Sequence, residues 1–257
     1  MGEAPLDGSA SDYFGAMTES YDSLIRRSVP RYDEMTDRLA QYLPVDAGRV
    51  LELGCGTGNL SERLAKNLPS ASIVFVDGSD EMIAVTRSRL GAGSAPAGGS
   101  REFIAARFED LSPVPGSFDL VVSSISLHHV DDKAALYEHI RHLLRPGGRF
   151  CFADQIRGEP ESNHQLNWRT WLEFCALPGH CSKEEIESLV QHSAAHDHYT
   201  TLADHFALLS GARFAEIDCV WRNSMWGIVT ATAASAEKSG SERNNARQAV
   251  SVSRSWY

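Results

Sequence analysis

Three glycines and a more distant aspartate are the residues of this chain whose types and spacing most clearly predict ligand chemistry. Gly54, Gly56 and Gly58 follow the short apolar run 50–53 in the sequence Glu-Leu-Gly-Cys-Gly-Thr-Gly. Glycine lets a backbone turn tightly and approach a ligand closely. Asp77 stands 19 residues after Gly58, at the end of a second apolar run, where a carboxylate can accept hydrogen bonds from ribose hydroxyls. Strand, glycine loop, helix, strand and acid together predict a nucleoside-binding βαβ unit.

The glycine spacing narrows the class of ligand. The dinucleotide fingerprint reads G-x-G-x-x-G, whereas this loop reads G-x-G-x-G, with Asn59 where the fingerprint requires a small residue. The run resembles motif I of the class I S-adenosylmethionine-dependent methyltransferases, in which the loop holds the methionine part of the cofactor. Later runs that are similar to this family lie at 118–124, 127–130 and 143–149. The resemblance covers about residues 12–233 and is strongest over 50–153.

The resemblance implies a set of residues that contact S-adenosylmethionine. The backbone of Gly54 to Gly56 would face the methionine part, and Asp77 would accept the ribose hydroxyls. Met82 would pack on adenine, and Ser124 would border the methionine amino group. The complete set of cofactor-binding residues predicted in this way is Tyr21, Glu52, Gly54, Cys55, Gly56, Asp77, Gly78, Met82, Arg107, Phe108 and Ser124.

One pair of these positions departs from the family pattern. Many members carry an acidic residue and then a small or apolar one after the third strand, where this chain has Arg107 and Phe108. The change removes the acid that usually contacts the adenine amino group. Phe108 can still cover the base, and its backbone N–H can still bond it.

Two adjacent histidines are the candidate catalytic residues. An acceptor must be held in line with the sulfur–methyl bond of the donor, and an oxygen or nitrogen acceptor can also need a base. His128 and His129 directly follow the fourth predicted strand, and histidine titrates near neutral pH. Position 129 is often histidine in the family, so this residue does not identify the acceptor. The alternative is that both histidines only pack or hydrogen-bond beneath a lid.

Further histidines and tryptophans are concentrated in the predicted lid. His192, His196 and His198 form the pattern H-x-x-x-H-x-H, a spacing that can bind zinc. No recognised second ligand cluster accompanies it, so the sequence favours exposed or substrate-facing histidines at a helix end and predicts no metal. Trp168 and Trp171 recur at helical spacing and can line an acceptor pocket or form ordinary lid core. The predicted acceptor-binding residues are Trp168, Trp171, His196 and His198.

The order of apolar patterns predicts one α/β fold with a helical lid. The expected fold is a Rossmann-like, doubly wound, seven-stranded sheet, mostly parallel with an antiparallel last strand. Residues 1–9 are expected to form a polar lead, Pro30 to interrupt the N-terminal helices, and the fifth strand to cover 149–153. In the lid, Ser182 and Glu185 are expected to form the capping box that starts one helix, and Asp197 is expected in the turn before the next helix. The expected segments are an N-terminal helical cap over 1–45, a cofactor-binding core over 46–154, a helical lid over 155–210, a closing β-hairpin over 211–234 and a disordered tail over 235–257.

Composition excludes several other classes. The formal net charge of −10 over 257 residues argues against general affinity for nucleic acid or an anionic membrane. No apolar stretch is long enough to cross a bilayer, and the N-terminus has no secretory signal pattern. Five scattered cysteines do not suggest a disulfide framework. We therefore expect a cytoplasmic protein that acts as a monomer or homodimer.

These observations predict a methyltransferase that uses S-adenosylmethionine and modifies an oxygen, nitrogen or carbon of a small molecule. Two alternatives stay open at this point. One is an enzyme that modifies the wobble uridine of tRNA, which a basic surface stripe leading to the pocket would favour. The other is a cofactor-binding regulatory protein without catalysis, because the fold alone does not establish an activity.

Overall fold

The computed structural model describes residue 13 and residues 18–91, 93–94, 98–112 and 115–235. The predicted N-terminal lead over 1–9 and almost all of the predicted C-terminal tail (236–257) lie outside these residues. None of the helices in the described part is both long and apolar enough to span a membrane.

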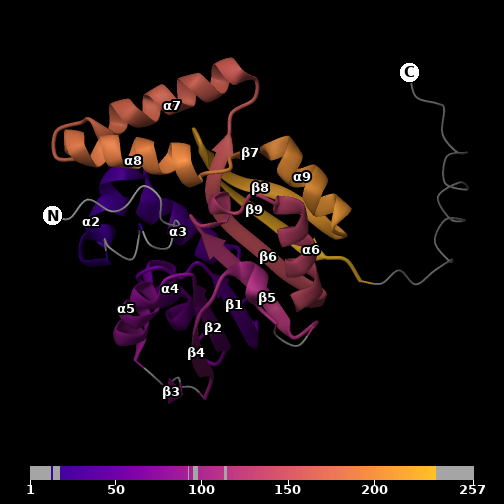
Figure 1. Cartoon of the computed structure of the whole chain (residues 1–257). Helices are drawn as coiled ribbons and strands as arrows, with labels where there is room; N and C mark the ends of the chain where they lie inside the picture. The colour runs from indigo at the N-terminus through magenta and orange to yellow at the C-terminus, as the bar shows by residue number, and fades with distance from the viewer. Residues whose placement is uncertain (1–12, 14–17, 92, 95–97, 113–114, 236–257) are drawn as a thin grey trace, which may run out of the picture.

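A twisted central sheet forms the middle layer of the molecule (Figure 1). Its strands follow the order β3-β4-β2-β1-β5-β6-β9-β8, with the short β7 paired to β6. All the pairings among β1, β2, β4, β5 and β6 are parallel, and β9 runs antiparallel to both of its neighbours. The strands are β1 (Arg49–Leu53), β2 (Ser72–Asp77), β3 (Gly93–Ser94), β4 (Ser100–Ala105), β5 (Phe118–Ser124), β6 (Leu144–Arg157), β7 (Thr200–Thr201), β8 (Phe214–Asn223) and β9 (Trp226–Ala233).

The apolar runs become central strands because both faces of the sheet are covered by helices. Alternate residues of β1 belong to different cores: Val50 packs with one cluster and Leu51 with the other. The first cluster includes residues of α3 (Tyr32–Gln41), α4 (Asn59–Asn67) and α5 (Asp80–Leu90). The second includes residues of α6 (Lys133–Leu143) and α9 (Leu202–Gly211). This arrangement confirms the predicted doubly wound α/β fold.

Three further helices lie together beyond one end of the sheet (Figure 1). They are α2 (Thr18–Ser28), α7 (Glu161–Cys175) and α8 (Lys183–His196). The Trp171 indole N–H donates to the Ser28 carbonyl at 2.8 Å, and Arg27 forms a bidentate pair with Glu185 at 2.7 Å for each bond. Helices α7 and α8 are therefore both tied to the N-terminal helix α2.

Local signals placed several element ends correctly, and one was misplaced. Ser182 and Glu185 form the predicted capping box of α8. Helix α2 ends before Pro30, and the next residue, Arg31, has a left-handed φ of 61°. The fifth long strand was expected to start at Arg149, but β6 begins at Leu144. Phe118 of β5 pairs with Leu144 and Leu120 pairs with Arg149, so residues 145–148 form an irregularity inside the ladder and not a turn before it.

Candidate functional site

A cavity of about 470 Å³ opens at the carboxyl ends of β1, β2 and β5. Ligands of open α/β sheets bind at this edge, and the volume lies in the range of small-molecule sites. Each of the eleven side chains or backbones that the sequence assigned to a cofactor lines this cavity. The structure thus brings the residues predicted to contact a cofactor together around one cavity.

The glycine loop after β1 has the backbone that its sequence requires. Gly54, Gly56 and Gly58 have φ values of 71°, 53° and 93°, a region that other residues rarely adopt. A Cβ on Gly54 would lie 2.3 Å from the Ser126 side chain, so no larger residue fits there. The loop is fixed at its start by the N–H of Gly54, which donates to the Val76 carbonyl at 2.8 Å.

Asp77 ends β2 and faces the same loop. Its carboxylate accepts hydrogen bonds from the Gly56 N–H at 2.8 Å and from the Ser79 N–H at 3.0 Å. Burial raises the pKa of Asp77, and the N–H groups of Ser79, Gly56 and Gly78 oppose that rise. The carboxylate is on the cavity lining, where further donors from a bound ribose would also favour its ionised form.

Glu52 lies beneath the loop and is 1% exposed. The Ser61 hydroxyl donates to its carboxyl group at 2.7 Å. Burial raises the pKa of Glu52 to about 8, and the nearby Asp77 charge adds to the rise. Glu52 is therefore mostly an uncharged acid at neutral pH.

The opposite wall of the cavity suits a flat apolar group. Met82 is 2% exposed and lines the cavity together with Gly78 and Phe108. Arg107 lies at the rim, with a side chain 75% exposed and 3.6 Å from Glu109. The structure thus places an arginine, and not an acidic residue, at this position of the rim.

The two candidate catalytic histidines follow β5 in the short helix η2 (Leu127–His129) and belong to a buried acid–base cluster. His128 Nδ1 contacts Asp154 Oδ1, and the same aspartate accepts the Leu127 N–H at 2.8 Å. His129 Nδ1 lies 3.1 Å from Asp197 Oδ1. The two imidazole rings are 4.0 Å apart, but only His129 lines the large cavity.

The charges and the burial in this cluster shift the pKa values of the two histidines in opposite directions. Burial opposes the charged form of His128, but the carboxylates of Asp154 and Asp197 outweigh it and raise the pKa of His128. Burial and the neighbouring His128 charge lower the pKa of His129. The arrangement thus favours the charged form of His128 and the neutral form of His129, which lines the cavity.

Asp197 completes this cluster from the lid. It follows α8, its side chain is 4% exposed, and its second oxygen accepts the Tyr199 hydroxyl at 2.6 Å. The next residue, His198, donates its backbone N–H to the His128 carbonyl at 2.7 Å. The end of α8 is therefore held directly against the histidine pair.

Three side chains of this cluster lie close enough together to hold a metal ion, whereas the three histidines of the pattern H-x-x-x-H-x-H do not. Within the described residues, one atom each of His128, His129 and Asp197 lies within 4.8 Å of the others. His192 approaches Asp197 at 3.8 Å, whereas His198 is 44% exposed and pairs with Asp131 at 3.1 Å. The pattern H-x-x-x-H-x-H thus does not converge on one point.

The predicted acceptor-binding residues are divided between different places. His196 and His198 line the large cavity. Trp171 lines a second, smaller cavity, together with His128. Trp168 belongs to the lining of neither and packs at 4.9 Å against Trp171.

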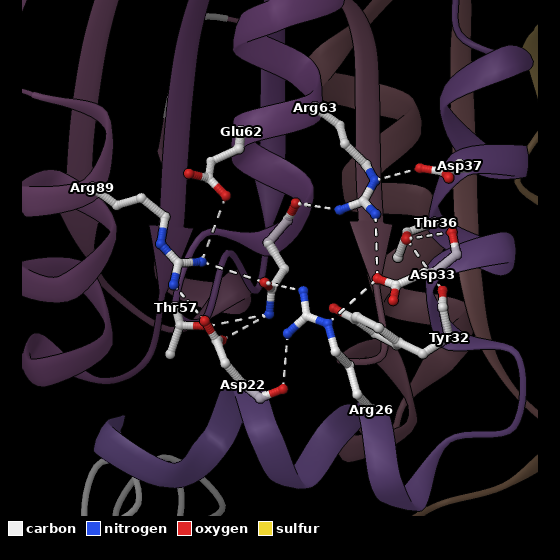
Figure 2. Close-up of polar contacts among 11 residues, drawn as sticks. Asp22, Arg26, Tyr32, Asp33, Thr36, Asp37, Thr57, Glu62, Arg63 and Arg89 are labelled. Atoms are coloured by element: carbon white, nitrogen blue, oxygen red, sulfur yellow. Dashed lines mark hydrogen bonds and ion pairs between the residues drawn. The ribbon is translucent and has the colours of Figure 1, made fainter.

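Asp22 of α2 is a residue of the site that the sequence did not reveal. It accepts hydrogen bonds from Thr57 and Asn59 next to the glycine loop and is paired with Arg89 of α5 (Figure 2). These partners lower the pKa of Asp22 despite partial burial. Arg26, one turn later on α2, donates to the Asp22 carbonyl at 2.8 Å. The network fixes α2 over the glycine loop, so that Tyr21 lines the cavity.

Comparison with known proteins gives a consistent result for the family. A family model described as "Methyltransferase domain" matches residues 50–148. The chain is 33% identical over 179 residues to a malonyl-[acyl-carrier protein] O-methyltransferase of Magnetococcus marinus, which covers 69% of this chain and 61% of that protein. It is 30% identical over 156 residues to an uncharacterized methyltransferase of Bacillus mycoides, covering 58% of this chain and 68% of that protein.

Solved structures agree on the fold. The phosphoethanolamine N-methyltransferase 2 of Haemonchus contortus, in complex with phosphomonomethylethanolamine and S-adenosylhomocysteine, aligns with a TM-score of 0.61 at 15% identity. The alignment covers 88% of this chain and 59% of that one. The chain spans 44% to 61% of the length of the first curated relatives that it matches.

Proposed function

The chain belongs to the class I S-adenosylmethionine-dependent methyltransferases, and from this premise we propose that it methylates a small molecule with His129 as the base. The acceptor atom is an oxygen, nitrogen or carbon. The observation that carries the proposal is the position of His129 on the cavity wall, with the carboxylate of Asp197 3.1 Å from its Nδ1.

The cavity fits the cofactor of this family. A Cβ at Gly54 would collide with the Ser126 side chain, so glycine keeps the loop narrow here. Asp77 offers a buried carboxylate for ribose hydroxyls, and Met82 with Phe108 offers an apolar slot for adenine. S-adenosylmethionine supplies an activated methyl group on a sulfonium sulfur. Ser124, Gly54 and Gly56 would hold its methionine part at the ends of β5 and β1.

His129 has the surroundings that a general base needs. The Asp197 carboxylate favours the tautomer with its proton on Nδ1, which leaves the lone pair on Nε2. The lowered pKa of His129 keeps the ring neutral near pH 7, so it can take a proton from an acceptor. His128 would act behind it as the charged partner of Asp154 and Asp197, and it holds Asp197 in place.

Several features support a small acceptor over a macromolecule. His128 lines a small cavity together with residues of α2, α7 and α8, and Asp197 and His128 are almost completely buried. The net charge of −10 opposes binding of RNA. The relative from Magnetococcus marinus is named as an O-methyltransferase, which favours oxygen among the three acceptor atoms. We place this activity in the cytoplasm, since all five cysteines are free thiols, and in a monomer or homodimer.

Transfer of a radioactive methyl group tests the proposal. The full chain is incubated with [methyl-³H]S-adenosylmethionine and, separately, with hydroxy acids, amino alcohols, phenols and bulk tRNA. We expect labelled small-molecule product, and we expect His129→Gln to lose turnover while keeping cofactor affinity. Labelled tRNA without labelled small molecules would contradict the acceptor class, and equal turnover of the variant would contradict the role of His129.

A further inference from the structure

A second cavity adjoins the cofactor cavity beneath the lid. Its volume is about 60 Å³, which is room for about four water-sized groups. Tyr21 and Ile125 line both cavities, so the two spaces are neighbours with these side chains between them. Because His129 belongs to the first cavity and His128 to the second, the histidine pair forms part of the boundary.

Much of the wall of this second cavity is apolar. It includes Leu24, Ile25 and Val29 from α2, Trp171 from α7 and Leu189 from α8. Such a wall suits a short aliphatic segment, and it leaves any polar group of a ligand dependent on a few specific partners.

Two neighbouring polar groups on the sheet side have no partner. Gln155 of β6 and Trp226 of β9 lie opposite each other in the antiparallel ladder, so their side chains share one face of the sheet. Trp226 is 1% exposed. Among the residues that the structure describes, neither its indole N–H nor the buried amide oxygen of Gln155 makes a hydrogen bond. A donor and an acceptor, groups that are normally paired when buried, are thus both left unsatisfied on the wall of the same cavity.

Several other polar side chains of this cavity contact one another or the residues behind the wall. His128 contacts Asp154, and Tyr199 bonds both Asp197 at 2.6 Å and Ser193 at 2.7 Å. His192 lies 3.8 Å from Asp197 Oδ1, and His128 lies between the carboxylates of Asp154 and Asp197. The charged carboxylates of this region thus face imidazole rings, whereas Gln155 and Trp226 need an uncharged ligand group.

We propose that this cavity is a recognition subsite for an aliphatic hydroxyl group of the methyl acceptor, separate from the atom that receives the methyl. The inference rests on the proposed function and deepens it. A hydroxyl is a single small group that can accept from the Trp226 indole and donate to the Gln155 amide oxygen. The reacting atom would lie near His129, at the boundary between the two cavities. The acceptor class is then a small molecule with a nucleophile and a second, hydroxyl-bearing end, such as an amino alcohol or a hydroxy acid.

The unsatisfied pair also predicts selectivity. An acceptor without the hydroxyl would leave both buried groups unpaired, and sites built to bond a hydroxyl reject analogues that lack it far more strongly than sites that only fill space. We expect hydroxylated acceptors to exceed their deoxy analogues at least ~10-fold in kcat/KM, given two lost hydrogen bonds. The variant Trp226→Phe, which removes the N–H and keeps an aromatic ring, should reduce this preference.

A binding experiment tests the subsite without knowledge of the true acceptor. The ¹⁵N-labelled full chain, loaded with S-adenosylhomocysteine, is titrated with 1-propanol, which has a hydroxyl on a short aliphatic chain of suitable size. The indole signal of Trp226 is identified by its loss in Trp226→Phe. The indole of Trp221, which already donates to Glu34 at 3.2 Å, serves as the internal control. We expect a saturable shift of the Trp226 signal while the Trp221 signal stays in place, and binding about five-fold weaker in Gln155→Leu, as for one lost hydrogen bond.

The possible failures can be told apart. If Trp226 and Trp221 shift together without saturation, or if Gln155→Leu binds propanol as the wild type does, the subsite is refuted. Calorimetry with S-adenosylhomocysteine on the same sample tests the cofactor site separately. If Trp226→Phe does not fold, the comparison of wild type with Gln155→Leu still decides the matter.

Discussion

Replacing Glu52 by glutamine should stabilise the protein, and more so as the pH rises. Glu52 is 1% exposed, and burial raises its pKa to about 8 from the ordinary value of 4.5. In the unfolded chain the carboxyl group loses its proton above pH 4.5, whereas in the folded chain it keeps the proton up to about pH 8. The unfolded state therefore binds fewer protons over this interval, and the free energy of unfolding falls as the pH rises.

The size of this effect follows from the two pKa values. Each pH unit between them costs about 1.4 kcal/mol, so Glu52 lowers the free energy of unfolding by about 2 kcal/mol at pH 6, about 3 at pH 7 and about 4 at pH 8. An amide does not ionise and avoids this cost. The amide oxygen introduced by Glu52→Gln can also accept the hydrogen bond from Ser61, which the carboxyl group now accepts at 2.7 Å.

Urea unfolding of the wild type and Glu52→Gln at pH 6, 7 and 8 measures the difference. We expect the advantage of the variant to grow by about 2 kcal/mol from pH 6 to pH 8. Glu138→Gln on the exposed side of α6 is the matched control and should show no such growth. A constant advantage, or a loss of stability at every pH, would refute the argument from burial.

Three further outcomes are expected. Asp197→Asn should lower turnover about ten-fold. It should also move the acidic limb of the pH–rate profile to lower pH, because the Asp197 carboxylate raises the pKa of His129; an unmoved profile would show that Asp197 does not act on His129. Asp22→Asn should lower the free energy of unfolding, measured in urea, by roughly 1–2 kcal/mol, because it removes the charge that accepts the bond from Arg89, and the partial exposure of this pair keeps the loss small; an unchanged free energy of unfolding would show that the network in Figure 2 does not stabilise the fold. Dialysis against EDTA should leave the Tm unchanged, since His128 and Asp197 already have charged partners; stoichiometric zinc in the purified protein, measured by plasma mass spectrometry, would contradict this expectation.

Features encoded by neighbouring residues could be predicted from the sequence. The glycine loop, Asp77 and the helix between them belong to one βαβ unit, so their spacing along the chain fixes their spacing in space. The capping box of Ser182 and Glu185 spans one turn and was equally readable. The family resemblance then extended this local reading to the order of the whole sheet.

Features that depend on long-range contacts could not be predicted. Asp22 reaches the glycine loop only because α2 folds back over it, and Asp197 reaches His129 only because the lid closes on η2. In the sequence Asp197 stood between His196 and His198 and was assigned to a turn. Gln155 and Trp226 are 71 residues apart in the chain and become neighbours only through the antiparallel register of β6 and β9.

The most direct test of the account is a calorimetric titration of the purified chain with S-adenosylmethionine and with S-adenosylhomocysteine, repeated on Asp77→Ala. We predict that one molecule of either ligand binds per wild-type chain, and that the variant binds at least ~100-fold more weakly because two bonds to a charged group are lost. A circular dichroism spectrum of the variant should match the wild type. Absence of binding to the wild type, or equal affinity of a folded Asp77→Ala variant, would contradict the assignment of the cavity.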